Sequence, residues 1–177
     1  MELRDKDGLT EREFLASYSS DKYPKPSLTA DVAVFSRDGE TLRLLLIRRG
    51  NHPCLGMLAL PGGFANKNEP LEQTAARELL EETGVSGVPL KLVGVFSKPG
   101  RDPRGWTVSA AYATVVDTSR VTVHAGDDAA DAQWYDVVQQ DGDILLRRGA
   151  EALSLRDGAG IAFDHVDIIK SALEQLG

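Results

Sequence analysis

Residues 63–85 read GFANKNEPLEQTAARELLEETGV, and the rest of the chain is organised around this stretch. Its second half, residues 71–83, consists of good helix formers with no internal glycine or proline. Pro70 stands at the entry, where a missing N–H costs nothing, and Gly84 stands where a C-terminal capping glycine belongs. The stretch therefore predicts a helix over residues 71–83.

One face of this helix carries Glu78, Glu81 and Glu82 within an arc of roughly 100°. Like charges at this spacing repel each other and weaken an isolated helix. A hard divalent cation over the face would remove that cost, because Mg²⁺ binds carboxylate oxygens together with water and substrate phosphates. The alternative is an acidic, solvated helix face, and the glutamates alone do not separate the two interpretations. The adjoining arc should face a core; its members are Ala75, Ala76, Leu79 and Leu80.

The residues around these glutamates follow a longer pattern. A glycine is followed after five residues by a glutamate, and after seven more by Arg-Glu, an aliphatic residue, any residue, Glu-Glu, any residue, glycine and a second aliphatic residue. This pattern meets every specified position of the Nudix box, so the chain resembles a Nudix hydrolase. The matching residues are Gly63, Glu69, Arg77, Glu78, Leu79, Glu81, Glu82, Gly84 and Val85.

The resemblance implies an α/β fold, a Nudix-type α/β/α sandwich with a mixed β-sheet. It implies hydrolysis of a nucleoside diphosphate linked to another group, with Mg²⁺ as the cofactor and Mn²⁺ as a substitute. It also implies that Arg77 and Glu69 pair within the catalytic machinery and hold the loop and the helix of the box together. The metal ligands that it implies are Glu78 and Glu82, with Glu81 as a further ligand and Gly63 beside them.

The composition sets limits on function. The net charge is −7, with 20 Lys and Arg against 27 Asp and Glu, which argues against broad nucleic-acid binding because that needs a basic face. Cys54 is the one cysteine, which excludes an internal disulfide and fits a reducing cytoplasm. The N-terminal residues lack an apolar segment and no apolar run approaches 18 residues, so no membrane association is expected.

The chain reads as a single domain over residues 1–177, with an N-terminal helix and an extended lead-in over residues 1–26 and the box at 63–85. A capping box formed by Thr10 and Glu13 begins the first helix. A polar loop is expected over residues 117–130, and Asp164 can cap a final helix. Strands are expected at 28–35, 42–47, 58–60, 90–97, 106–116 and 133–135, with one or two short strands within 144–163.

Four arginines are candidates for binding a diphosphate. Arg101 and Arg104 lie in the loop SKPGRDPRG, residues 97–105, and guanidinium groups match phosphate oxygens bidentately. Arg48 and Arg49 end a buried strand and could reach the same group. The alternatives are that the loop arginines tie the loop to nearby acids and that the strand-end arginines are surface charges. The loop also resembles a segment of ADP-ribose pyrophosphatases, as do residues 23–29 and 163–165.

Hydrolysis needs a base that takes a proton from the attacking water. Relatives often place an acidic residue in the loop after the long strand, and here that loop offers Asp127, Asp128 and Asp131. We expect Asp128 to be the base, because it stands nearer to the anchored strand that follows. Glu81 or Glu82 is the alternative, and loop solvation or turn capping is the competing role for each aspartate.

The leading functional hypothesis is therefore a Mg²⁺-dependent ADP-ribose pyrophosphatase that releases AMP and ribose 5-phosphate. A second hypothesis keeps the chemistry and changes the substrate to an oxidised nucleotide or another nucleotide sugar. A third is a regulator that senses ADP-ribose; such regulators tend to have a degraded box and a basic C-terminal extension, whereas here the box is intact and only residues 164–177 follow the last strand region. A homodimer is one expected state, because dimers are common among similar proteins.

Overall fold

The first long strand, β1 (Ser27–Asp38), is the centre of the protein, whose computed structural model describes residues 2–118, 123 and 129–176. Eight consecutive residues of this strand are buried, because both of its faces are covered. It runs parallel to β6 (Thr107–Val116) and antiparallel to β2 (Thr41–Arg49). The mixed β-sheet expected from the resemblance is therefore confirmed.

The sheet within the described residues has the order β5-β6-β1-β2-β7-β8-β9. Two short strands lie off this path, and they carry the chain into the Nudix box: β3 pairs with β2, and β4 pairs with β1. The remaining strands are β3 (Leu58–Ala59), β4 (Gly62–Phe64), β5 (Lys91–Phe96), β7 (Ala129–Gln140), β8 (Asp143–Arg148) and β9 (Glu151–Ser154).

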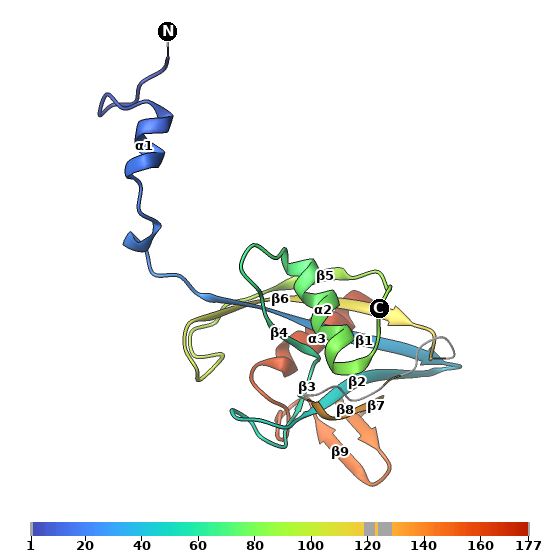
Figure 1. Ribbon diagram of the computed structural model, residues 1–177. Helices are drawn as coiled ribbons and strands as arrows, with labels where there is room; N and C mark the ends of the chain where they lie inside the picture. Colours follow the sequence, from blue (N-terminus) through green and yellow to red (C-terminus); the bar gives the residue numbers. More distant parts are fainter. Residues whose placement is uncertain (1, 119–122, 124–128, 177) are drawn as a thin grey trace.

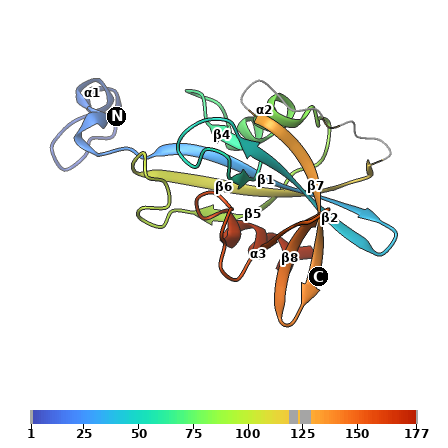
Figure 2. The same ribbon diagram turned by 90° about the horizontal axis from the view of Figure 1, so that it is seen from below.

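The helices α2 (Leu71–Thr83) and α3 (His165–Leu176) cover opposite faces of the sheet, as Figure 2 shows. Ala75 and Leu79 of α2 pack in one core against β1 and β6. Ile168 and Ile169 of α3 pack in a second core against the other face. The α/β/α layering is thus formed by two cores that share one sheet. No helix in the described part of the chain is long and apolar enough to cross a membrane.

The N-terminal residues extend away from the sheet and its two helices (Figure 1). They contain α1 (Glu11–Ser17) and a short 3₁₀ helix, Ser20–Lys22. The capping box is present, because the Thr10 side chain accepts from the Glu13 N–H while the Glu13 carboxylate accepts from the Thr10 N–H. No side chain of α1 is buried.

Two expectations about local structure are wrong. The strand expected at residues 133–135 is the much longer β7, because it pairs with β2 on one side and β8 on the other. Ala76 and Leu80 do not face the core; the buried side chains of α2 are Thr74, Ala75, Leu79 and Thr83. The two threonines can be buried because their hydroxyls donate to the Glu69 carboxylate and the Leu79 carbonyl.

Adjacent leucines on α2 test this assignment of its buried face. Leu79 is 1% exposed and Leu80 is 49% exposed. Leu79→Ala should lower the free energy of unfolding by about 2–5 kcal/mol, because it leaves a cavity in a packed core. Leu80→Ala should change it by less than about 0.5 kcal/mol. Urea denaturation of both variants makes the comparison, and similar losses from the two substitutions would contradict the assignment.

Candidate active site

The candidate site lies where the β3–β4 turn meets the helix of the Nudix box. Glu82 of α2 accepts a hydrogen bond from the Gly62 N–H at 2.9 Å. The carboxylate of Glu78 lies so close to Gly63 that a Cβ there would approach its oxygens to 2.6 Å. A Cβ on Gly62 would overlap the carbonyl oxygen of Ala30 in β1. Two adjacent glycines are therefore needed for the turn to fit between β1 and the two glutamates.

Burial at this turn perturbs both glutamates. The pKa of Glu82 is raised to about 8, mainly by burial and in part by the nearby charges of Glu78 and Asp31, against the lowering effect of the hydrogen bond from Gly62. Burial also raises the pKa of Glu78, against the opposing effect of Arg77. Three carboxyl groups thus lie close together with too little positive charge to compensate them. A cation placed here would replace the proton that Glu82 otherwise holds.

Arg77 connects the parts of the box. Its Nε and Nη2 atoms donate to the two oxygens of Glu69 at 2.9 and 3.0 Å. Its Nη1 donates to Glu78 at 2.6 Å and to Glu81 at 3.0 Å, and Nη2 also reaches the Phe64 carbonyl. Hydrogen bonds from Arg77, and then from the Asn66 N–H, lower the pKa of Glu69 to about 2. Arg77 and Glu69 therefore hold the loop against the helix.

The residues of the box fit a hard divalent cation. Glu78 and Glu82 supply carboxylate oxygens at a turn that has room for no side chain. Within the described residues, no three Asp, Glu, His or Cys side chains already enclose a metal position. Mg²⁺ suits a site with only two carboxylate ligands, because it typically binds one or two carboxylates and completes its coordination shell with water and substrate phosphate. Glu81 is more exposed than the other two and is held by Arg77.

A cleft of about 380 Å³ opens over the two glutamates. Arg49 and Arg104 lie on its wall, and both guanidinium groups stack on aromatic rings. Arg104 is 4.6 Å from the ring centre of Phe64 and 5.6 Å from that of Phe163, while Arg49 is 4.9 Å from Phe163. Asp102 holds Arg104 by hydrogen bonds to Nε and Nη2. The cleft therefore combines carboxylates for a cation with two arginines for an anion.

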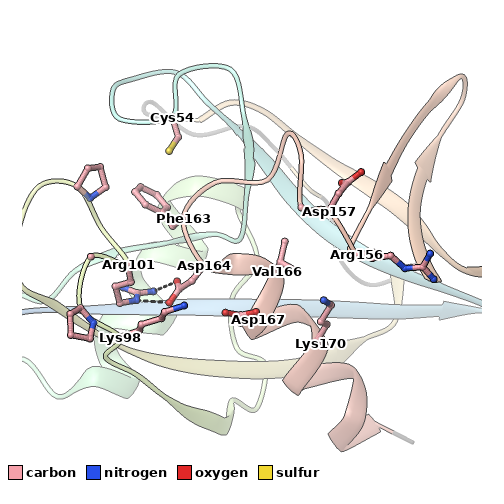
Figure 3. Close-up of a pocket in the computed structure, with 14 residues that line it drawn as sticks. Cys54, Lys98, Arg101, Arg156, Asp157, Phe163, Asp164, Val166, Asp167 and Lys170 are labelled. Atoms are coloured by element: carbon pink, nitrogen blue, oxygen red, sulfur yellow. Dashed lines mark hydrogen bonds and ion pairs between the residues drawn. The ribbon is translucent and has the colours of Figure 1, made fainter. Parts of the chain in front are cut away.

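The other two arginines proposed for the substrate do not line this cleft, although Arg101 lines a smaller adjoining pocket beside Gly62 and Gly63. Arg101 is buried, and its Nε and Nη2 donate to Asp164 at 2.8 and 2.6 Å (Figure 3). Arg48 lies on the opposite face of β2, where it pairs with Glu151 at 3.1 Å and donates to the Gly56 carbonyl. Because side chains alternate along a strand, only one of two adjacent arginines can face the cleft. Arg49 and Arg104 therefore line the cleft, and Arg104 is also paired with Asp102, whereas Arg48 and Arg101 are paired with Glu151 and Asp164 outside it.

A larger hollow, of about 580 Å³, lies beside Arg101 and α3 (Figure 3). Its charged lining includes Lys98, Arg156 and Lys170, together with Asp157 and Asp167. None of the glutamates of the box lines it. Size alone would favour this hollow, but the chemistry of the smaller cleft makes that cleft the candidate active site.

Of the three aspartates considered as the base, only Asp131 belongs to the described residues. Asp127 and Asp128 lie outside the described residues. Asp131 is in β7, where its carboxylate accepts from the Gln133 side chain at 2.6 Å, and it pairs in register with Arg48. It therefore stands beside the arginine that faces away from the cleft.

Three residues of the site were not anticipated: Asp31, Phe64 and Phe163. Asp31 is a buried acid within β1, 6% exposed, and its Oδ1 would touch a Cβ on Gly62. A lone aspartate within an otherwise apolar strand is the signal that would have found it, because a buried charge is rarely placed without a partner. Phe163 lies in residues 163–165, whose resemblance to ADP-ribose pyrophosphatases was its one signal, and Phe64 carries none, since exposed rings are common.

Comparison with known proteins places these features in a family. The NUDIX domain model matches residues 25–151. An ADP-ribose pyrophosphatase of Methanocaldococcus jannaschii is 35% identical over 84% of this chain and 73% of its own length. The ADPR responsive transcriptional repressor NtrR of Acinetobacter baylyi is 34% identical over 94% of this chain, which spans only 61% of that protein.

Solved structures give the same result. A MutT/nudix family protein from Enterococcus faecalis superposes with a TM-score of 0.84 and 35% identity, over 95% of this chain and 70% of that one. The NUDIX domain of Shewanella oneidensis NrtR, solved in complex with ADP ribose, gives a TM-score of 0.75 and 30% identity, over 96% of this chain and all of that one.

The raised pKa of Glu82 predicts how stability depends on pH without metal. An acid whose pKa is higher in the folded state stabilises the fold while it is protonated, and this contribution is lost as pH rises from about 4.5 towards 8. Glu82→Gln cannot ionise, so in chelator it should match the parent near pH 5 and exceed it at pH 8, by up to about 4 kcal/mol. Glu81→Gln, which changes a more exposed glutamate of the same helix, is the matched control.

Urea denaturation in EDTA at several pH values measures this difference. A difference between parent and Glu82→Gln that stays constant across the pH range would contradict burial as the cause. Saturating Mg²⁺ should remove most of the deficit of the parent at pH 8, because the cation takes over the role of the proton.

Proposed function

The chain belongs to the Nudix family, and from this premise we propose that it hydrolyses the diphosphate of ADP-ribose to AMP and ribose 5-phosphate in the presence of Mg²⁺ or Mn²⁺. The observation that carries the proposal is the meeting of an intact Nudix box with two arginines at one cleft. The cleft pairs a place for a cation, at Glu78 and Glu82, with cationic side chains for a diphosphate. The pyrophosphatase relative and the ADP-ribose complex of a related domain support the choice of substrate.

The residues of the cleft have separate tasks in this proposal. A divalent cation supplies charge neutralisation and makes the attacking water more acidic. Glu78 and Glu82 hold that cation, and Gly63 leaves the space they need. Arg49 and Arg104 bind the diphosphate oxygens, and the Phe163 ring, which lies beneath both guanidinium groups, helps to hold them in place. Water then forms a bond to one phosphorus while the bridging P–O bond breaks.

The proton of the attacking water needs an acceptor. We propose Asp128, in the segment between β6 and β7, and it lies outside the described residues. A carboxylate on such a segment can reach the water when substrate is bound. Glu81 is the next candidate, since it lies on the metal face of α2, where Arg77 holds it.

A second candidate is an ADP-ribose sensor without turnover. The match to the Acinetobacter repressor favours it, because that match covers most of this chain. The intact box favours hydrolysis instead. Calorimetric titration with ADP-ribose, followed by analysis of the products, separates the two: a sensor binds ADP-ribose and leaves it whole in saturating Mg²⁺.

The substrate is tested with a panel of nucleotides under saturating Mg²⁺. The panel holds ADP-ribose, other nucleotide sugars, dinucleotides and oxidised nucleoside triphosphates, and chromatography identifies the products. We expect the highest kcat/KM for ADP-ribose, with AMP and ribose 5-phosphate in equal amounts. A higher kcat/KM for a triphosphate, with release of pyrophosphate, would assign the chain to a different Nudix substrate class.

The metal role is tested with Glu82→Gln, which keeps the size of the side chain and its bond to Gly62. Turnover should fall by about 100-fold or more, because both charge neutralisation and water activation depend on the cation. Glu72→Gln lies on the same helix away from the cleft and should retain parental turnover. Near-normal turnover of Glu82→Gln in saturating Mg²⁺ would exclude Glu82 as a ligand.

Arg104 is tested by its effect on binding. Arg104→Ala should raise KM for ADP-ribose by about 10- to 150-fold, since a charge-assisted hydrogen bond contributes about 1.5–3 kcal/mol. Its kcat should fall less than its affinity. Arg37→Ala, at the exposed end of β1, is the matched control. Unchanged KM and kcat for Arg104→Ala would mean that the loop has only a structural role.

A further inference from the structure

His165, the first residue of α3, is buried between the sheet and the site, and its two ring nitrogens have different partners. The Leu60 N–H donates to Nδ1 at 2.9 Å, so Nδ1 is an acceptor and carries no proton. Nε2 faces Oδ1 of Asp31 at 3.5 Å. The imidazole is therefore neutral with its proton on Nε2, in agreement with a pKa that burial lowers.

The bond to Leu60 is one of three that fix the backbone leading into the metal site. The N–H groups of Leu58 and Leu60, two residues apart in an extended segment, point to the side of α3, and after the bend at Pro61 the N–H of Gly62 points to α2. The Leu58 N–H donates to the Gly160 carbonyl at 2.8 Å, and the Gly62 N–H donates to Glu82 at 2.9 Å. Between them, the Leu60 N–H has no carbonyl partner and donates to His165 instead.

We propose that His165 is a positioning residue of the metal site: its Nδ1 holds the Leu60 N–H and its Nε2 faces Asp31, and together these contacts fix the backbone that places the Gly62 N–H, which orients Glu82. The inference rests on the proposed function, in which Glu82 holds the cation. It extends that function to a residue which touches neither the cation nor the substrate.

Asp31 provides a second connection between His165 and the turn at Gly62. One of its oxygens accepts from the Ser109 hydroxyl and the other faces His165, so its carboxylate is fixed on both sides. The same carboxylate lies against Gly62, its partner in the β1–β4 register. The imidazole and the turn thus contact the same buried carboxylate from two sides. A displacement of the ring would therefore displace Asp31 and, through it, the turn.

The preceding residues reach other parts of the site from the same short segment. Asp164 binds Arg101 of the 98–105 loop, and the Phe163 ring stacks on Arg49 and Arg104. Phe163 has a positive φ of 54°, a conformation that is unfavourable for a bulky residue and persists only where the surroundings enforce it. Residues 163–165 therefore join α3 to the turn, the loop and the cleft at once.

The test compares His165→Leu, which removes the acceptor, with His165→Asn, whose Oδ1 can stand where Nδ1 stands. The first measurement is Mn²⁺ affinity of the substrate-free protein by electron paramagnetic resonance. Removal of a partner that orients a ligand typically weakens metal binding by about 10- to 100-fold. We expect that loss for leucine and recovery to within about threefold of the parent for asparagine. The second measurement is kinetic: leucine should lower kcat and leave KM for ADP-ribose within about twofold.

Gln175→Ala is the matched control, because it removes a hydrogen bond from α3 to the Val93 carbonyl without touching the site. It should bind Mn²⁺ as the parent does.

Parental Mn²⁺ affinity in His165→Leu would overturn the proposal, as would a folded His165→Asn that binds no better than His165→Leu. If the leucine variant fails to fold, His165→Gln replaces it, because its longer side chain places the amide towards Asp31 and away from the Leu60 N–H. The proposal then requires that His165→Asn binds Mn²⁺ more tightly than His165→Gln. The proposed function fails separately, if the parent binds Mn²⁺ in this way but does not hydrolyse ADP-ribose.

Discussion

The site depends on one steric constraint: residues 62 and 63 must have no side chains. Glu78 occupies the space that a Cβ on Gly63 would take, and β1 occupies the space beside Gly62. This allows a backbone turn to enter between a buried strand and the acidic face of a helix. The turn then offers its own N–H to Glu82, so part of the desolvation of that carboxylate is offset by the backbone.

The electrostatics of the box follow from where its single arginine points. Arg77 donates to Glu69, Glu78 and Glu81, and within the described residues none of its hydrogen bonds goes to Glu82. The positive charge of Arg77 thus lies beside Glu69, Glu78 and Glu81, and the more buried Glu82 has a pKa of about 8. A fold that needed only a stable helix would gain from neutralising Glu82. Leaving it uncompensated costs stability in the absence of metal and creates affinity for a cation.

The sequence predicts best what short-range signals determine. Both ends of α2 match the structure, because Pro70 and the left-handed Gly84 act within one turn of the helix. The β1–β2 hairpin follows from Asp38 and Gly39 in the same way. The buried face of α2 was less predictable, because burial of Thr74 and Thr83 depends on hydrogen bonds that composition does not reveal. Which of Arg48 and Arg49 faces the cleft depends on the register of β2 against its neighbours, and that is a tertiary property.

The groups proposed to bind the cation and those proposed to bind the rest of the substrate come from different parts of the chain. The carboxylates proposed to hold a cation lie within one continuous stretch of sequence, so a local pattern suffices to find them. The groups that would meet the rest of a substrate come from β2, from the 98–105 loop and from the residues before α3, and they are joined only through contacts such as Arg101 with Asp164 and Arg104 with Phe163. Changes in those contacts can alter the cleft while the box stays intact. A conserved chemistry with variable substrates is the outcome that this physical separation favours.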